Sequence, residues 1–397
     1  MDMKRKKSTK RNGNFAPKGY LALLLAFLMS ALLFLPISAE PADRGTLSFE
    51  CKSAILMDAK TGEVLFAQNA DEALPPASVT KVMTLLLVME AIEDGRISLG
   101  DVVTASAHAS SMGGSQIFLK EGEQMTVEDL VKSVVIASAN DAALALAEHL
   151  SGSEEAFVAR MNERAAELGM TNTHFENTNG LDDTVERHVT SARDIALMSR
   201  ALIAHEKITE FASIWQDTIR GGEFGLTNTN RLVRFYRGAT GLKTGSTAKA
   251  GFCVSATAER DGMSLICVIM GAPSRDIRNA AATSLLDWGF ANFALYTHRA
   301  SDLAPLRVRG GVSESCSLRA EEFSAVVPRS EVSQVSMRIE LPDALDAPVA
   351  EGDEVGRIVY TLGERELGSL SITACESVER VGFWGIFARI LRAASLG

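Results

Sequence analysis

The chain has 397 residues, of which 46% are hydrophobic and 23% are charged, and its formal net charge is −10. This length exceeds what one ordinary core organises, so we expect two folded domains with appended segments of a globular rather than a disordered protein. The acidic balance excludes nucleic acid as the expected partner, because binding to phosphates requires a basic surface that displaces counterions.

The N-terminus has the three-part pattern of a secretory signal peptide. Residues 1–18 contain seven Lys and Arg side chains and one Asp, an apolar run follows over 21–35, and the small residues Ser38 and Ala39 come next. We therefore expect residues 1–39 to be removed. Removal takes away seven positive charges and one negative charge, so the net charge of the mature chain becomes about −16. A retained single-span anchor is the alternative.

Two short strands and a long helix open the folded part. Residues 54–57 are expected to form a buried strand, 58–62 a turn and 63–67 the returning strand. After Pro75 and Pro76 the pattern predicts a helix from Ser78 to Glu93 that is apolar on nearly every side. Such a helix belongs in the middle of a fold.

Further helices and then strands follow. Helical patterns occupy the segments 126–138, 141–150, 154–168 and 191–205, and strand patterns occupy 251–258, 263–270 and the segment around Lys243, before a last helix over 278–293. Helices in the middle of the sequence, with strands before and after, predict an α/β sandwich whose antiparallel sheet joins both chain ends. We take residues 45–297 as this domain.

The C-terminal hundred residues differ in pattern. Residues 300–376 have short strand-like runs and predict a small all-β domain. In the tail, 377–397, a helical projection places six apolar side chains on one arc, opposite Arg389 and Arg392: Phe383, Trp384, Ile386, Phe387, Ile390 and Leu391. The tail is too short to span a bilayer comfortably, so we expect a helix lying in the membrane interface. A helix docked on the protein's own body is the alternative.

Five cysteines remain after the expected cleavage: Cys51, Cys253, Cys267, Cys316 and Cys375. Their odd number and wide spacing match neither a disulfide framework nor a zinc site. Cys253 and Cys267 flank an expected turn and can face each other across two strands, but buried free thiols are favoured.

The motif Ser78-Val79-Thr80-Lys81 places a hydroxyl and an amine three residues apart at a helix start, on one face. A serine hydroxyl needs a base to become nucleophilic, and a lysine in a dry, cation-crowded pocket has its pKa lowered enough to serve. The motif alone is common, and a helix cap with a surface lysine is the alternative reading.

Two further motifs follow in the chain. Ser138-Ala139-Asn140 lies in a turn between helices, where a hydroxyl can relay a proton and an amide can hold a peptide group. Lys243-Thr244-Gly245 precedes Ser246 on a strand edge, where charge and hydroxyl suit a carboxylate and glycine allows close approach of substrate. The same letters at Lys60-Thr61-Gly62 precede Ser78 and are interpreted as a hairpin turn.

In order and spacing the three motifs resemble those of the low-molecular-mass penicillin-binding proteins, which are serine-type D-alanyl-D-alanine carboxypeptidases (peptidase S11-like). The likeness covers about residues 45–295 and is carried by four segments: Pro76 to Thr84, Ser138 to Ala143, Asn179-Gly180-Leu181 and Gly241 to Gly245. The β-rich and amphipathic segments match the usual layout of that family. The resemblance implies a β-lactamase/transpeptidase-like fold.

The resemblance also implies residue roles. Ser78 would be acylated with Lys81 as general base, Ser138 would shuttle the proton and Asn140 would orient the peptide. The remaining substrate-binding residues would be Lys243, Thr244, Gly245, Ser246 and Arg278. Among these, Lys243 and Thr244 would hold the terminal carboxylate, and the backbone N–H groups of Ser78 and Ser246 would form the oxyanion hole. Arg278 would add a second carboxylate contact; a surface arginine at a helix start is the alternative.

The expected reaction is removal of the terminal D-alanine from peptidoglycan stem pentapeptides, with β-lactams as covalent inhibitors and no cofactor. D,D-endopeptidase or β-lactamase-like hydrolysis is an alternative, although Glu176 and Asn179 lack the spacing of the deacylating loop of class A β-lactamases. An inactive cell-wall scaffold is an alternative of another class. The histidines, among them His108 and His188, lack metal-ligand spacing. The expected location is the outer face of the cytoplasmic membrane.

Overall fold

The structure, a computed structural model, describes residues 47–395 except 184 and 302. The expected signal peptide over 1–39 lies outside these residues.

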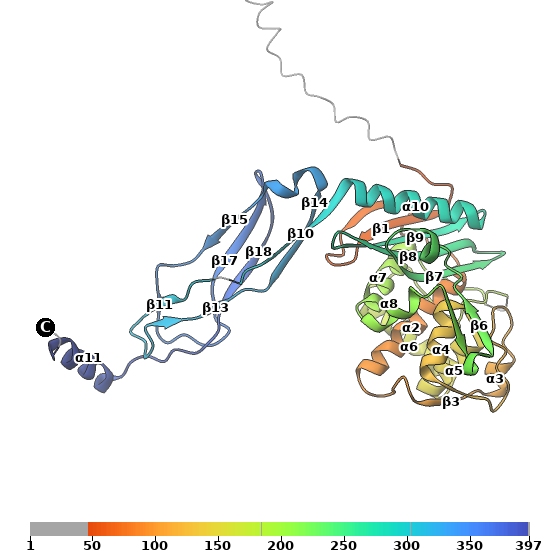
Figure 1. Ribbon diagram of the computed structural model, residues 1–397, viewed down its shortest axis with the longest axis horizontal. Helices are drawn as coiled ribbons and strands as arrows, with labels where there is room; N and C mark the ends of the chain where they lie inside the picture. Colours follow the sequence, from red (N-terminus) through yellow and green to blue (C-terminus); the bar gives the residue numbers. More distant parts are fainter. Residues whose placement is uncertain (1–46, 184, 302, 396–397) are drawn as a thin grey trace, which may run out of the picture. The chain divides into compact units, whose positions relative to one another are not determined.

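A five-stranded sheet in the order β2-β1-β9-β8-β7 forms the centre of the first domain (Figure 1). Its strands are β1 (Ser53–Asp58), β2 (Val64–Gln68), β7 (Ala239–Thr247), β8 (Gly251–Arg260) and β9 (Met263–Ala272). All neighbouring pairs are antiparallel, and β1 from the start of the domain pairs with β9 from its end. The expected antiparallel sheet that joins both chain ends is therefore confirmed.

Helices cover both faces of this sheet (Figure 1). α10 (Arg275–Asn292) packs on one face against β8 and β9, and α7 (Ala192–Ile203) packs on the other against β1 and β9. α2 (Lys81–Glu93) lies deeper, between α7 and the helical group α4 (Val127–Ile136), α5 (Asn140–Ser151) and α6 (Glu154–Glu167). Ten of its thirteen side chains are buried, and they lie on all sides of the helix, as predicted for a helix that is apolar on nearly every side.

Hydroxyl caps set the helix starts. Thr126 accepts a hydrogen bond from the N–H of Asp129 and begins α4, and Ser153 does the same for α6. At the last helix the prediction was wrong by three residues. Ser274 accepts from the N–H of Ile277, so α10 begins at Arg275 rather than at residue 278.

Other boundaries also differ from expectation. The segment predicted as one helix from Ser78 is a 3₁₀ turn, η1 (Ala77–Thr80), that leads into α2. α7 ends at Ile203, and a further helix, α8 (Glu206–Ala212), follows it. Short elements complete the domain: β3 (Val102–Thr104) with β4 (Gln124–Thr126), β5 (Gln216–Ile219) with β6 (Phe224–Thr227), α3 (Ala107–Ser110), η2 (Arg220–Gly222) and α9 (Leu232–Phe235).

Residues Lys60-Thr61-Gly62 form the β1–β2 turn, as predicted. Asp58 Oδ1 accepts from both the backbone N–H and the hydroxyl of Thr61, and Gly62 has a φ of +76°.

The five cysteines are free thiols, which confirms the expectation of free thiols rather than a disulfide. Cys267 pairs with Ala256 across β8 and β9, whereas Cys253 lies at a bulge, so the two do not face each other.

The C-terminal part is all β. Its main sheet has the order β13-β18-β17-β15, beside a three-stranded and a two-stranded sheet. Tyr360 is fully buried and stacks on Phe323 with ring centroids 3.9 Å apart. The elements are β10 (Phe293–Arg299), β11 (Leu306–Arg309), β12 (Ser315–Cys316), β13 (Leu318–Arg319), β14 (Glu322–Pro328), η3 (Arg329–Gln334), β15 (Val335–Glu340), β16 (Leu345–Asp346), β17 (Glu354–Leu362) and β18 (Arg365–Ala374).

The tail contains α11 (Phe383–Ser395). All six side chains of the predicted apolar arc are exposed, from Ile386 at 47% to Trp384 at 77%. The Arg389 guanidinium donates to the carbonyl oxygens of Gly311 and Val312. Among the described residues, no helix has the length and apolar character needed to cross a bilayer.

Candidate active site

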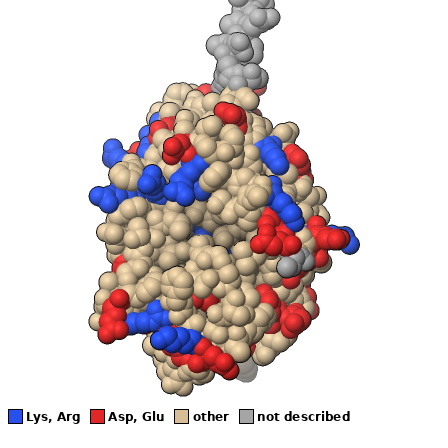
Figure 2. Space-filling view, turned by 90° about the vertical axis from the view of Figure 1, so that its right-hand side faces the viewer, with Lys and Arg blue, Asp and Glu red and all other residues tan. Residues whose placement is uncertain are grey.

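A cavity of about 370 Å³ brings the three sequence motifs together. Figure 2 shows the corresponding side of the molecule, where a hollow with basic atoms in its depth opens in a mainly uncharged surface. The cavity is lined by Ser78, Ser115, Ser138, Trp215, Thr227, Asn228, Thr229, Arg231, Thr244, Gly245, Ser246, Arg275 and Arg278. A larger cavity of about 780 Å³ is lined by none of the motif residues, so size alone does not locate the site.

Ser78 lies within η1, and Lys81 is the first residue of α2. The Lys81 Nζ atom lies 2.9 Å from Ser78 Oγ and 2.9 Å from the carbonyl oxygen of Asn179, to which it donates. The Lys81 side chain is fully buried, and this burial, with the charge of Lys243 as the second cause, holds its pKa well below the usual 10.5. Lys81 is therefore suited to accept the hydroxyl proton of Ser78. The alternative of a surface lysine is contradicted.

Lys243 on β7 contacts the second motif. Its Nζ donates to Ser138 Oγ at 2.9 Å and to the carbonyl oxygen of Thr244 at 2.7 Å. Burial, followed by the charge of Arg278, lowers the pKa of Lys243 to about 7. Ser138 has a φ of +65° in the turn before α5, and this backbone conformation presents its hydroxyl to the cavity.

The cavity carries a group of cations and hydroxyls suited to a carboxylate. Arg278 is only 3% exposed and lines the cavity, so the alternative of a surface arginine at a helix start is wrong. Burial, with Arg275 as the second cause, lowers its pKa to about 10, which leaves it charged at neutral pH. The Thr244 hydroxyl donates to Thr229 Oγ1 at 2.9 Å. The sequence analysis did not identify Thr229 as a residue of the site.

Asn140 is buried behind the cavity rather than in its lining. Its Nδ2 donates to the carbonyl oxygen of Gly113 at 2.7 Å. Its backbone N–H donates to the carbonyl oxygen of Ser115. Within the described residues its Oδ1 is buried without a hydrogen-bond partner. An unpaired buried acceptor is costly, and the N–H of a bound peptide is the type of group that would satisfy it.

Gly245 allows β7 to approach the turn that carries Ser78. A Cβ atom at Gly245 would lie 2.7 Å from the backbone nitrogen of Ser78 and 2.9 Å from the carbonyl oxygen of Pro76. Only glycine leaves room for this contact between two backbones. The close approach brings the N–H of Ser78 near the strand segment that contains Ser246.

Gly180 and His188 support the turn that carries the nucleophile. Gly180, with a φ of +84°, has no room for a Cβ against the carbonyl oxygen of Ala77, so the loop that contains it lies directly on the nucleophile turn. His188, 3% exposed, accepts from the N–H of Glu176 at Nδ1, so its Nε2 carries the proton that it donates to Thr80 Oγ1 at 2.7 Å. Burial lowers the pKa of His188 to about 4.

Sequence comparison connects this geometry to known proteins. A model of the D-alanyl-D-alanine carboxypeptidase family matches residues 38–274, and one of the penicillin-binding protein 5 C-terminal domain matches 304–380. The D-alanyl-D-alanine carboxypeptidase DacF of Bacillus subtilis is 40% identical over 376 residues, which cover 92% of this chain and 96% of the relative.

Solved structures give the same result. Penicillin-binding protein 5 from Haemophilus influenzae has a TM-score of 0.73 at 33% identity, with 84% of this chain and 99% of that chain covered. Penicillin-binding protein D2 from Listeria monocytogenes, in its ampicillin-bound form, has a TM-score of 0.57 at 32% identity, with 62% and 99% covered. The β-lactamase/transpeptidase-like α/β fold with a C-terminal β domain is thereby confirmed.

Proposed function

The chain belongs to the D-alanyl-D-alanine carboxypeptidase family and is a hydrolase of this type, and from this premise we propose that Ser78 is its nucleophile and Lys81 its general base. The observation that carries the proposal is the 2.9 Å contact between Lys81 Nζ and Ser78 Oγ in a buried setting that favours the neutral amine. The substrate is the D-Ala-D-Ala end of a peptidoglycan stem peptide.

Acylation begins when Lys81 takes the proton of Ser78 Oγ, which attacks the carbonyl carbon of the penultimate D-alanine. The N–H groups of Ser78 and Ser246 stabilise the resulting oxyanion. The bond to the terminal D-alanine then breaks, and its nitrogen receives the proton by way of Ser138 Oγ. Water hydrolyses the Ser78 ester in the second half of the cycle.

The terminal carboxylate is held by side chains other than Ser78 and Lys81. Lys243, Thr244 and Arg278 supply two cations and a hydroxyl for this group, and the arginine suits the planar geometry of a carboxylate. Gly245 and Ser246 flank the peptide. Substrate binding must uncover Asn140 Oδ1, which is buried behind the cavity, before this atom accepts the peptide N–H. Penicillins also carry a carboxylate beside a reactive carbonyl, so they acylate Ser78 and inhibit the enzyme.

Release of D-alanine tests the reaction. We expect the soluble mature chain to release free D-alanine from a pentapeptide that ends in D-Ala-D-Ala, and the Ser78→Ala variant to release none above background. A pentapeptide that ends in L-Ala is the matched control substrate. Release by Ser78→Ala equal to that by the wild type would contradict the proposed nucleophile.

We propose the following organisation for the whole chain: a signal peptide over 1–39, the catalytic domain over 45–297, a β-rich domain over 300–376 and a membrane-anchoring helix over 377–397. Strand β10 crosses the boundary between the second and third of these and pairs with β14. The enzyme acts on the cell wall outside the cytoplasmic membrane. The exposed apolar arc of α11 supports peripheral attachment to the outer face of that membrane, because such an arc gains free energy when it leaves water for the lipid interface.

A further inference from the structure

The loop that contains Asn177, Thr178 and Asn179 supplies the carbonyl group that holds Lys81, and its own support comes from a carboxylate outside the three motifs. The carbonyl oxygen of Asn179 accepts from Lys81 Nζ, and the carbonyl oxygen of Thr178 accepts from the hydroxyl of Thr84, the fourth residue of α2. Two successive carbonyl groups of this loop thus bind the catalytic helix.

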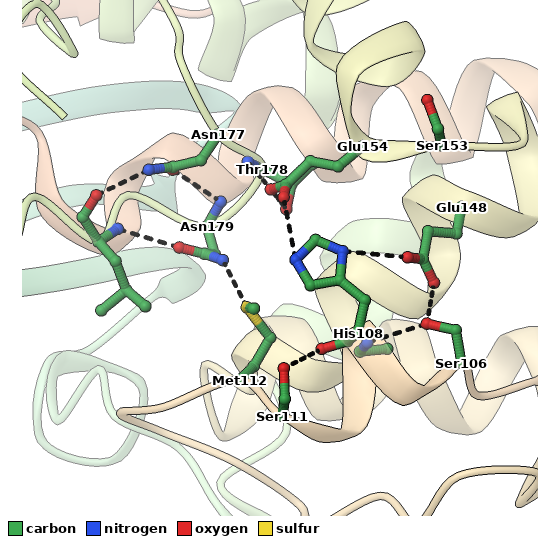
Figure 3. A network of polar contacts seen from close by, with 12 residues as sticks. Ser106, His108, Ser111, Met112, Glu148, Ser153, Glu154, Asn177, Thr178 and Asn179 are labelled. Atoms are coloured by element: carbon green, nitrogen blue, oxygen red, sulfur yellow. Dashed lines mark hydrogen bonds and ion pairs between the residues drawn. The ribbon is translucent and has the colours of Figure 1, made fainter. Parts of the chain in front are cut away.

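Glu154, the first residue of α6, binds this loop on its other side (Figure 3). Its Oε1 atom accepts from both the backbone N–H of Thr178, at 3.0 Å, and the Thr178 hydroxyl, at 2.9 Å. Thr178 is fully buried, so these donors depend on Glu154 for a partner. Asn177 closes the loop by accepting from the N–H groups of Asn179 and Gly180.

The other Glu154 oxygen faces His108, whose Nε2 lies 3.8 Å from Oε2 and whose Nδ1 lies 3.3 Å from Glu148 Oε1. Glu148 in turn accepts from the Ser106 hydroxyl, which caps α3. Figure 3 shows His108 between the two carboxylates and the loop beyond Glu154. These contacts restrict the position of Glu154, while Glu148 binds His108 and the Ser106 hydroxyl rather than the loop. Glu154 is therefore the connection between α6 and the loop.

We propose that Glu154 is a positioning residue for the reaction, which fixes the Thr178–Asn179 carbonyl groups so that the lone pair of Lys81 is directed at the Ser78 hydroxyl. When the neutral amine of Lys81 donates one N–H to the Asn179 carbonyl oxygen, the directions available to its lone pair and its other N–H bond are restricted. If that carbonyl group moves, the amine is no longer aligned with Ser78. Small displacements of reacting groups of this kind cost large factors in rate.

Substitution of Glu154 gives an asymmetric prediction. Glu154→Ala removes the acceptor for both Thr178 donors, whereas Glu154→Gln keeps an oxygen that can accept from them. We expect Glu154→Ala to lower the limiting rate of acylation by a fluorescent penicillin about tenfold. The half-saturating penicillin concentration should stay within about twofold, because the groups proposed to bind the carboxylate, Lys243, Thr244 and Arg278, make no hydrogen bond with Glu154 or Thr178 among the described residues. Glu154→Gln should restore the limiting rate to within about twofold of the wild type.

Glu155→Ala is the matched control. It removes the neighbouring acid, which is exposed, from the same first turn of α6. Loss of a negative charge near the helix start therefore has the same effect on α6 in both variants. Its acylation rate should equal that of the wild type. If Glu154→Ala does not fold, as judged by circular dichroism, Thr178→Val decides the question: loss of the hydroxyl alone should lower the limiting rate about threefold.

The inference rests on the proposed role of Ser78, and the two fail in different ways. If the wild type is not acylated at Ser78, the proposed function is wrong and the inference falls with it. If the wild type is acylated but Glu154→Ala, or Thr178→Val in its place, reacts at the wild-type limiting rate, only the inference is wrong. Equal loss in Glu154→Ala and Glu154→Gln also overturns it.

Discussion

Lys81 and Lys243 are both fully buried, yet the proposed mechanism needs them in opposite protonation states. Lys81 must be neutral to accept a proton from Ser78, and Lys243 must be charged to hold a carboxylate. Burial lowers the pKa of each, and the second cause is the charge of Lys243 at Lys81 and the charge of Arg278 at Lys243. The contact with Ser78 Oγ makes Lys81 the proposed base, and the neighbouring Arg278 makes Lys243 the proposed anion-binding cation, so the two lysines differ in the protonation state that the reaction requires.

This difference predicts the pH dependence of acylation. The second-order rate constant should rise with pH as Lys81 loses its proton, and should fall above a pH of about 7 as Lys243 loses its own. In Lys243→Arg the guanidinium stays charged, so the descending limb should disappear even if the maximum rate is lower. The rate of penicillin acylation measured from pH 5 to 10 tests this. The same descending limb in both proteins would contradict the assignment to Lys243.

Gly245 gives a steric prediction. In Gly245→Ala the new methyl group meets the backbone of Ser78 and Pro76, neither of which can move like a flexible side chain. We expect β7 to shift away from the nucleophile and acylation to slow by about a hundredfold.

The matched control for this change is Gly225→Ala, because Gly225 also lies in a strand, β6, but has open space around its Cβ direction. Its acylation rate should be unchanged, and circular dichroism should show both variants folded. A Gly245→Ala variant as fast as Gly225→Ala would contradict the close contact between β7 and η1.

The sequence predicted those parts of the site whose residues lie close together on one helix or strand. The separation of three between Ser78 and Lys81 placed both at one helix start, and the strand around Lys243 was recognised. The Asn179 carbonyl group and Thr229 were missed, since their contacts join segments far apart in sequence. The alternative for Arg278 arose from a helix boundary, because the cap at Ser274 was not recognised.

Among helices and strands, the distribution of apolar residues around the element predicted its burial reliably. α2 is apolar all round and buried, whereas α11 has an apolar arc that is exposed. The hairpin of β5 and β6 was missed because these strands are four residues long and each buries a single side chain, Ile219 or Leu226. Such strands show no alternation that distinguishes them from a polar loop.

The exposed arc of α11 predicts binding to lipid. We expect the full mature chain to co-sediment with phosphatidylglycerol vesicles, and the double variant Phe383→Ser, Phe387→Ser to remain mostly in the supernatant. Each buried phenylalanine contributes roughly 2 kcal/mol to such partitioning. Penicillin acylation should be equal in the two proteins, because α11 carries none of the residues that line the catalytic cavity.

Met337→Ser is the control for this measurement, since Met337 is also exposed, at 49%, but lies on β15. It should co-sediment as the wild type does. Equal co-sedimentation of the double variant and the wild type would show that the apolar arc of α11 does not bind the membrane.

At the scale of the whole molecule, the sheet explains how one site is built from distant segments. β1 pairs with β9, so the two ends of the catalytic domain meet in one sheet, and β7 at its edge lies against η1. The helical group between them supplies Ser138 and the Asn179 loop. The antiparallel sandwich was predictable from the order of strand and helix patterns, while the edge position of β7 was not, because strand order depends on pairing between distant segments.

The covalent bond at Ser78 is the central step of the proposed reaction. The measurement is incubation of the soluble mature chain with a labelled penicillin, followed by peptide mapping with mass spectrometry, with Ser78→Ala in parallel. We predict one adduct, on the peptide that contains Ser78, and its loss in the variant. A label on another residue, or an equal label in Ser78→Ala, would contradict the proposed mechanism.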